Sequence, residues 1–224
     1  MRGKLIVIEG SDSSGKETQS KLLIQALREK GINVEKFSFP NYDSPSGKIV
    51  GDCYLGRSGN GLFPETAPNV NPKVAALYYA ADRKYNIHKI EFLLDNGIHV
   101  ILDRYVYSNM AHQGCKFNDF ESRKKMYEWL DQLEYGLLEL PVPDIAIYLR
   151  MPPRQAYILK RSRGAEDENE KNEAYLEASF NSFEELAKTY QFKVIDCCDQ
   201  YGLRTKEEIS EEVVNVVVEE LNKK

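Results

Sequence analysis

The chain has 224 residues, of which 42% are hydrophobic, and its formal net charge is −5. This length and composition suit one domain with a single sizeable core. The acidic balance argues against a broad nucleic-acid-binding surface, and no apolar run approaches the roughly 20 residues of a membrane span. Four cysteines without CxxC spacing and three histidines make a zinc site improbable. We expect no signal peptide and a cytoplasmic protein.

The first pattern along the chain is a strand, a glycine-containing loop and a helix. Residues 5–8 are all apolar, the loop GSDSSGKET follows, and a helical pattern runs from about Lys16 to Lys30. Glycines let the backbone wrap around an anion, and the helix N-terminus adds partial positive charge. Lys16 would reach the β- and γ-phosphates of a nucleotide. The residues of this predicted phosphate-binding loop, which the family resemblance described below implies to bind ATP, are Gly10, Ser11, Asp12, Ser13, Ser14, Gly15, Lys16, Glu17 and Thr18.

The residue after the lysine departs from the usual pattern. A Ser or Thr hydroxyl commonly holds magnesium there, but this chain has Glu17, and Thr18 comes one place later. One helical residue turns the side chain by roughly 100°, so Thr18 is not a simple substitute. Either Glu17 ligates the metal or other groups and waters do. A solvated glutamate that the helix dipole favours is an equally good interpretation of Glu17.

An irregular segment separates the second strand from a long helix. Residues 33–39 are predicted as a strand, and residues 40–71 are rich in Pro and Gly, with a short helix near 46–55. Such long loops are often binding loops or lids, although a dispensable surface excursion is the alternative.

The long helix is predicted over residues 72–96. Tyr79 and Arg83 stand one turn apart on one of its faces, where they could stack on and hydrogen-bond a planar ring. A core tyrosine and a solvated arginine are the plainer interpretation of this spacing.

The third predicted strand, residues 98–102, ends in an ionisable pair. Asp103 and Arg104 would therefore lie at the carboxyl edge of the sheet, where the phosphate loop also lies. Asp103 could accept a proton or hold a magnesium-bound water, and Arg104 could clamp a phosphate. A local Asp–Arg salt bridge is the alternative. Residues 107–114 supply further polar side chains at this edge, Ser108 and His112 among them.

The second half of the chain continues the alternation of helices and strands, which predicts a doubly wound α/β fold: a five-stranded parallel sheet with helices on both faces. One helix ends in the basic run that contains Arg161 and Arg163, which is either a cationic clamp over a triphosphate or a solvated charged face. The remaining predicted helices cover residues 120–140, 171–190 and 205–221, and the remaining strands 145–149 and 192–195.

These pieces together resemble the thymidylate kinase family of P-loop nucleoside-monophosphate kinases. The resemblance covers nearly the whole chain and rests on the order of its motifs. They are GSDSSGKETQ from Gly10, FP at Phe39, AADR ending at Arg83, DRYVYS from Asp103 and PxPDxxIYL from Pro141. The resemblance implies one P-loop kinase domain over residues 1–224, with a short lid at approximately 160–171.

The resemblance also implies the reaction and its residues. It implies ATP as co-substrate, Mg²⁺, dTMP as acceptor and a homodimer, with neither nucleic acid nor membrane as partner. The helices from Pro72 and Phe120 are candidates for the dimer interface, and the sequence leaves open which apolar stripe is core and which is interface. Because Ser13 and Ser14 leave the phosphate loop without an arginine, the lid would supply it. Tyr105 and Tyr107 would exclude a ribose 2′-hydroxyl. The implied catalytic residues are Asp12, Lys16, Asp103, Arg104, Arg161 and Arg163. The implied substrate-binding residues are Phe39, Tyr79, Arg83, Arg104, Tyr105, Ser108 and His112. The candidate metal ligands are Glu17 and Asp103.

Two further positions depart from the family pattern. Many members carry a phosphate-binding arginine where this chain has Tyr42, so Arg104 or a lysine such as Lys48 is expected to carry more of the acceptor phosphate. Arg150 stands where an aspartate is common, and the sequence offers no physical account of it.

Two other functions remain open at this point. One is a P-loop kinase for another pyrimidine nucleotide or for a deoxynucleoside, because Tyr79 and Arg83 cannot read the 5-methyl group. The other is a nucleotide-binding regulatory or scaffold protein without turnover, which Glu17 and Tyr42 motivate.

Overall fold

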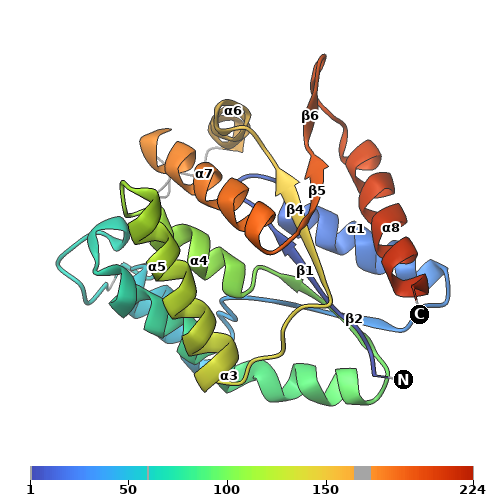
Figure 1. Cartoon of the computed structure of the whole chain (residues 1–224), viewed down its shortest axis with the longest axis horizontal. Helices are drawn as coiled ribbons and strands as arrows, with labels where there is room; N and C mark the ends of the chain where they lie inside the picture. Colours follow the sequence, from blue (N-terminus) through green and yellow to red (C-terminus); the bar gives the residue numbers. More distant parts are fainter. Residues whose placement is uncertain (1, 60, 164–172, 224) are drawn as a thin grey trace.

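A five-stranded parallel sheet forms the centre of the molecule (Figure 1). The computed structural model describes residues 2–59, 61–163 and 173–223, and the side chains of 2–59, 61–159 and 174–223. The strand order is β2-β3-β1-β4-β5, and every pairing is parallel, so the predicted sheet is confirmed. The strands are β1 (Leu5–Glu9), β2 (Val34–Ser38), β3 (His99–Asp103), β4 (Ile145–Arg150) and β5 (Lys193–Asp196).

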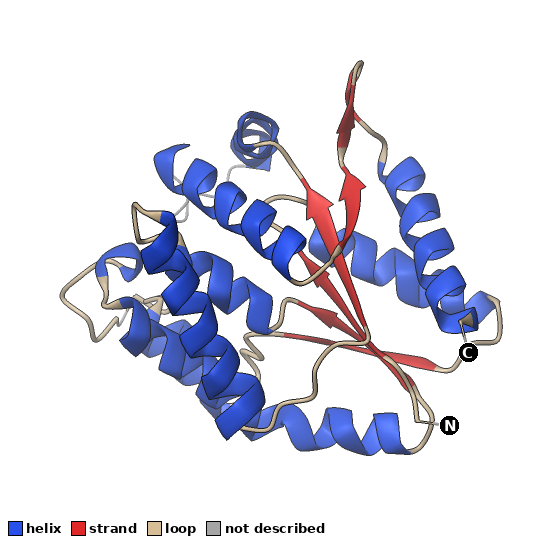
Figure 2. Cartoon of the chain, viewed as in Figure 1, coloured by secondary structure: helices blue, strands red, loops and turns tan. Residues whose placement is uncertain are grey.

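Helices cover both faces of the sheet (Figure 2). Strand β1 is central and buried throughout, so its alternate side chains belong to two separate cores. Ile6 and Ile8 pack with α1 (Lys16–Glu29) and α8 (Lys206–Asn222), whereas Leu5 and Val7 face the other core. The helices on that other face are α3 (Pro72–Asp95), α4 (Val106–Gly114), α5 (Phe120–Asp131) and α7 (Glu173–Thr189).

Several local elements differ from the sequence-based expectation. The helix predicted over 120–140 ends at Asp131, and a π-helical turn, η3 (Gln132–Leu137), follows it. The helix predicted near 46–55 is split into α2 (Pro45–Lys48) and a second π-helical turn, η1 (Ile49–Tyr54). Such turns shift the helical register by one residue and often occur at functional sites. The short 3₁₀ helix η2 (Ala67–Asn69), helix α4 and the hairpin of β6 (Cys198–Asp199) and β7 (Gly202–Leu203) were not predicted.

The remaining helix, α6 (Pro153–Arg163), follows β4. No helix in the described ranges is long and apolar enough to cross a bilayer.

Candidate active site

The phosphate loop lies between β1 and α1. Ser13 and Gly15 have φ angles of 62° and 88°, the left-handed conformations that turn successive N–H groups toward one concavity. Lys16 folds over this loop, and its Nζ donates to the Ser11 carbonyl at 2.6 Å. Burial, together with nearby Arg104, lowers the pKa of Lys16 to about 8. The Ser11 hydroxyl is buried without a partner among the described residues, so the loop retains polar groups for an anion and its counter-ion.

Arg104 connects the phosphate loop to the end of β3. It has a φ of 67°, and its Nη2 donates to Asp12 Oδ1 in the loop. Burial alone would raise the pKa of Asp12, but the charges of Arg104 and Lys16 hold it below its usual range. Burial likewise opposes the charged form of Arg104, and Asp12 and Asp103 nevertheless raise its pKa. Both groups are therefore charged at neutral pH and largely offset one another.

Glu9 is a site residue that the sequence analysis missed. Its carboxylate ends β1 and is fully buried. It accepts hydrogen bonds from Tyr105 N at 2.8 Å, from Ser108 N at 3.1 Å and from the Ser108 hydroxyl. It thus satisfies the free N–H groups at the start of α4. Burial raises the pKa of Glu9, although Ser108 and Arg104 act in the opposite direction. The sequence did contain a signal for Glu9, namely a single acidic residue at the end of an apolar strand.

A cavity of about 290 Å³ lies next to the Asp12–Arg104 pair. Its walls come from the segment after β2, from α3, from α4 and from the loops between residues 54 and 68. All seven predicted substrate-binding residues lie in its wall: Phe39, Tyr79, Arg83, Arg104, Tyr105, Ser108 and His112. Three other predicted residues, Glu17, Asp103 and Lys48, do not line it.

Arg83 is less available to a ligand than expected. Its Nη2 donates to Glu134 Oε1 at 2.6 Å and its Nε to Oε2, and both side chains are buried. Glu134 reaches this position because the turn η3 brings it inward. Nη1 is the remaining guanidinium nitrogen for a ligand. The alternative interpretation of Arg83 as a solvated arginine is wrong, because the side chain is buried and its charge requires a partner.

Two neighbouring amides complete the inner wall of the cavity. Asn109 Nδ2 donates to Glu134 Oε1 at 2.9 Å, which leaves Asn109 Oδ1 buried without a partner among the described residues. Gln113 Oε1 is likewise buried without a hydrogen-bond partner among the described residues. Unpaired buried acceptors beside an arginine N–H suit a planar ring that carries both an N–H and a carbonyl. Both amides belong to residues 107–114, which were predicted to lie at this edge, but neither was predicted individually as a site residue.

His112 links Arg104 to helix α7. Its Nε2 lies 3.2 Å from Arg104 Nη1, and its Nδ1 lies 2.8 Å from the Tyr175 hydroxyl. Because Arg104 can only donate, Nε2 accepts and Nδ1–H donates to Tyr175. Burial lowers the pKa of His112 to about 4, so the ring is neutral at physiological pH. The ring therefore orients Arg104 rather than adding a charge.

The two candidate metal ligands differ in position. Glu17 is exposed and its carboxylate lies 2.6 Å from Lys21 Nζ, one helical turn away. Asp103 is nearly buried at the end of β3, and its charge acts on Lys16. No group of three or more His, Cys, Asp or Glu side chains that could hold a metal occurs in the described part of the chain. Mg²⁺ usually keeps several waters and takes one or two protein carboxylates, so Asp103 suits such an ion better than Glu17.

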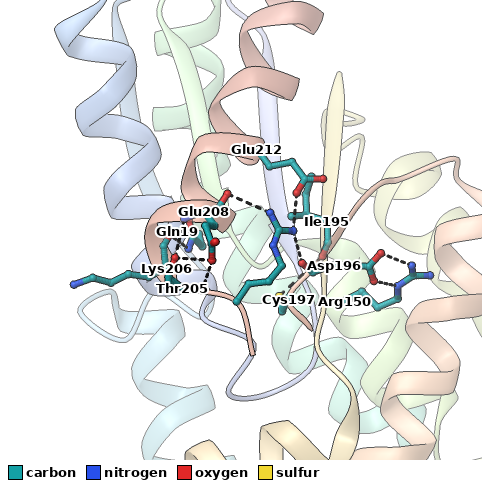
Figure 3. A network of polar contacts seen from close by, with 10 residues as sticks. Gln19, Arg150, Ile195, Asp196, Cys197, Thr205, Lys206, Glu208 and Glu212 are labelled. Carbon is teal, nitrogen blue, oxygen red and sulfur yellow. Dashed lines mark hydrogen bonds and ion pairs between the residues drawn. The ribbon is translucent and has the colours of Figure 1, made fainter. Parts of the chain in front are cut away.

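Arg150 has a structural explanation. Its Nη2 donates to Asp196 Oδ2 at 2.7 Å, which joins the carboxyl ends of β4 and β5 (Figure 3). Its Nη1 lies 3.7 Å from Glu184, so Arg150 also contacts α7. Arg204 extends this network from the hairpin to α8, because it donates to the Asp196 carbonyl and to Glu212. The network fixes the strand ends beside the phosphate loop.

Two predicted catalytic residues cannot be placed in the site. Arg161 and Arg163 belong to the last turn of α6, and their side chains lie outside the described residues. Most of the predicted lid, residues 160–171, lies outside them as well. Their roles stay predictions.

The sheet, the glycine loop with its lysine and the adjoining cavity together define a P-loop nucleotide kinase. The sequence model of the family described as thymidylate kinase matches residues 8–209. The chain is 32% identical to the thymidylate kinase of Schizosaccharomyces pombe over 96% of this chain and 92% of that protein. It is 31% identical to human thymidylate kinase over 87% and 82% of the two chains. The chain therefore belongs to the thymidylate kinase family.

A solved structure supports the same assignment. The thymidylate kinase of Candida albicans, whose structure is described as revealing the origin of broad substrate specificity, superposes with a TM-score of 0.75. That alignment covers 99% of this chain and 93% of the other at 25% identity.

The buried His112 predicts a pH dependence of stability. Its pKa is about 4 in the folded state and 6.5 when unperturbed, so the unfolded chain binds the additional proton between these values. Stability contributed by the neutral ring is complete above pH 6.5 and is lost as the pH falls toward 4. In urea unfolding between pH 6.5 and 5, the His112→Gln variant should lose less stability than the parent, by up to about 1.4 kcal/mol per pH unit. Equal losses would show that His112 titrates normally.

Proposed function

We propose that this protein transfers the γ-phosphoryl group of ATP to dTMP and produces dTDP for dTTP synthesis. The observation that carries this proposal is the Asp12–Arg104 pair, which joins the phosphate loop to a cavity lined by Tyr79 and Arg83. Family membership favours dTMP over other acceptors. A protein without turnover is not favoured, since Lys16, Asp12 and Arg104 are all in place around the loop.

The cavity suggests how dTMP would lie. Its phosphate would lie beside Arg104, close to the phosphate loop, and its thymine ring beside Tyr79, Arg83 and Asn109 at the inner end. Arg83 Nη1 can donate to a ring carbonyl, and Asn109 Oδ1 can accept from the ring N–H. The buried ring of Tyr105, which contacts Phe39, would close the space beside the sugar.

The chemistry requires mainly positioning and charge neutralisation. The attacking oxygen belongs to a phosphate that is already anionic, so no strong general base is needed. Lys16 would neutralise charge on the transferring group, and Arg104 would hold the acceptor in line with it. Magnesium bound with ATP would supply further neutralisation, and Asp103 would hold one of its waters. The lid arginines, Arg161 and Arg163, would close over the triphosphate.

A coupled assay with ATP and magnesium tests the reaction. The protein should prefer dTMP to dUMP, UMP, CMP and AMP at equal concentration. Lys16→Met should lower kcat at least about 100-fold, because removal of such a charge costs about 3 kcal/mol or more. Lys21→Met, which removes an exposed lysine on the same helix, is the matched control and should leave kcat unchanged. Equal turnover of dTMP and UMP would contradict the assignment, and binding of ATP without turnover of any acceptor would favour a regulatory protein.

We further propose that the protein is a homodimer that packs through α3. This helix exposes an apolar stripe at Val74, Leu77, Tyr85 and Phe92, which share one face by helical spacing. Phe92 is 67% exposed and Tyr85 is 55% exposed. Large apolar side chains that are exposed together on one face are typical of a protein–protein interface. A location in the reducing cytoplasm is also proposed, and the four free cysteines support it.

Light scattering coupled to size exclusion tests the dimer. The Leu77→Asp/Phe92→Asp variant should elute as a monomer at micromolar concentration, because two desolvated carboxylates would face each partner. Tyr201→Asp, at an 88% exposed position on the β6–β7 hairpin, is the control and should not change the mass. A parent protein of monomer mass would contradict the proposal.

A further inference from the structure

The positively charged side chains that line the cavity differ in whether a carboxylate already neutralises them. Arg83 is offset by the carboxylate of Glu134, and Arg104 by that of Asp12. Arg57 also lines the cavity, and it has no carboxylate within ion-pair distance among the described residues. A phosphate monoester carries close to two negative charges at neutral pH. The cavity therefore needs a positive charge beyond the balanced Asp12–Arg104 pair.

The remaining cation of the cavity is committed elsewhere. Lys116 Nζ donates to the carbonyls of Ala67 and Val70, at 3.2 and 3.0 Å, and so ties the 67–70 segment to α4. Burial lowers the pKa of Lys116 to about 8. Lys48 is exposed on α2 and does not line the cavity, so it is not a second phosphate ligand here. Among the described cavity residues, Arg57 is therefore the guanidinium without a carboxylate partner.

Arg57 is stacked on Tyr42. Its Cζ lies 4.1 Å from the centroid of the Tyr42 ring, which is a close cation–π contact. Tyr42 follows the carboxyl end of β2, whose last residue pairs with Asp103. Burial raises the pKa of Tyr42, and the charges of Arg57 and Arg104 both act to lower it. Tyr42, Arg57 and Arg104 all line the cavity.

The Tyr42 ring is held by a rigid turn. The buried carboxylate of Asp82 on α3 accepts from Asn41 N at 2.8 Å, from Ser46 Oγ at 2.7 Å and from Asn86 Nδ2 at 2.9 Å. This network fixes the backbone immediately before the tyrosine.

The other side of the stack also has a defined support. Gly51 lies against Tyr42, since a Cβ at Gly51 would stand 2.9 Å from Tyr42 Cδ1. The Gly51 carbonyl accepts from Arg57 N at 3.0 Å, so the same glycine makes room for the ring and positions the arginine backbone. Both segments therefore support the stack, in which Tyr42 and Arg57 are each exposed to solvent, Tyr42 with 37% of its surface.

We propose that Arg57 binds the phosphate of the acceptor nucleotide together with Arg104, and that Tyr42 is the residue that positions it. This inference rests on the proposed function, because the acceptor is taken to be a nucleoside monophosphate. Guanidinium groups bind phosphate oxygens in a bidentate manner, and a stacked one loses less conformational freedom on binding. Tyr42 carries no positive charge itself, but its ring holds the charged guanidinium group of Arg57 in place.

Calorimetric binding of dTMP and of thymidine, the nucleoside without phosphate, tests the proposal. Arg57→Gln should weaken dTMP binding about 10- to 100-fold and leave thymidine binding within about twofold, since only the phosphate contact is lost. Lys48→Gln removes a nearby exposed cation and should change neither affinity. Unchanged dTMP binding, or equal weakening of both ligands, would overturn the role of Arg57.

Variants of Tyr42 and Gly51 test whether Tyr42 positions Arg57. Tyr42→Ala should raise the KM for dTMP with little effect on the KM for ATP, whereas Tyr42→Phe keeps the stacking ring and should behave as the parent. Gly51→Ala should resemble Tyr42→Ala, because its Cβ displaces the ring. A Tyr42→Phe variant as weak as Arg57→Gln would assign the phosphate contact to the hydroxyl and overturn the positioning role.

The same series separates this inference from the proposed function. If the parent phosphorylates dTMP and the Arg57→Gln variant still binds dTMP as tightly as the parent, only the proposed role of Arg57 is rejected. If the parent phosphorylates a different monophosphate, the proposed function fails, and the comparison of that monophosphate with its nucleoside decides the role of Arg57. A parent that binds no nucleoside monophosphate would overturn both.

Discussion

The carboxylate of Glu9 connects the two halves of the active site. It ends β1, the strand that enters the phosphate loop, and it binds the N–H groups that begin α4 after β3. Because β1 and β3 are paired in parallel with Ile8 opposite Asp103, the loop and α4 start at the same edge of the sheet. This contact fixes Arg104 between them, where it meets Asp12. The proposed position of the acceptor relative to the phosphate loop depends on this arrangement.

The charges of the site are balanced in pairs, and the exceptions indicate where ligands bind. Buried ions are costly unless they are paired, and Arg83 with Glu134 and Arg104 with Asp12 satisfy this requirement. Among the described residues, Lys16 donates to loop oxygens, and Arg57 is stacked on an aromatic ring. In the proposed arrangement, Lys16 would meet the phosphates of ATP and Arg57 would meet the phosphate of dTMP.

The sequence was informative where the determinants are local. The apolar run of β1, the loop glycines and the Asp103–Arg104 pair each follow from a short pattern, and the parallel sheet follows from the alternation of elements. Glu134 was missed because a glutamate in an amphipathic helix normally faces solvent, and only the π-helical turn and a contact with Arg83, 51 residues away, bring it inside. Arg57 was missed because it stands in a Gly- and Pro-rich segment whose fold depends on Tyr42 and Gly51.

The central claim is that Asp12 and Arg104 act as one unit that joins the phosphate loop to the acceptor cavity. A double-mutant cycle of Asp12→Asn and Arg104→Gln, with kcat/KM for dTMP as readout, tests it most directly. The account predicts strong coupling, about 1–3 kcal/mol, with the double variant little worse than the poorer single variant. Losses that simply add in the double variant would show that the two residues act independently, and would contradict the account.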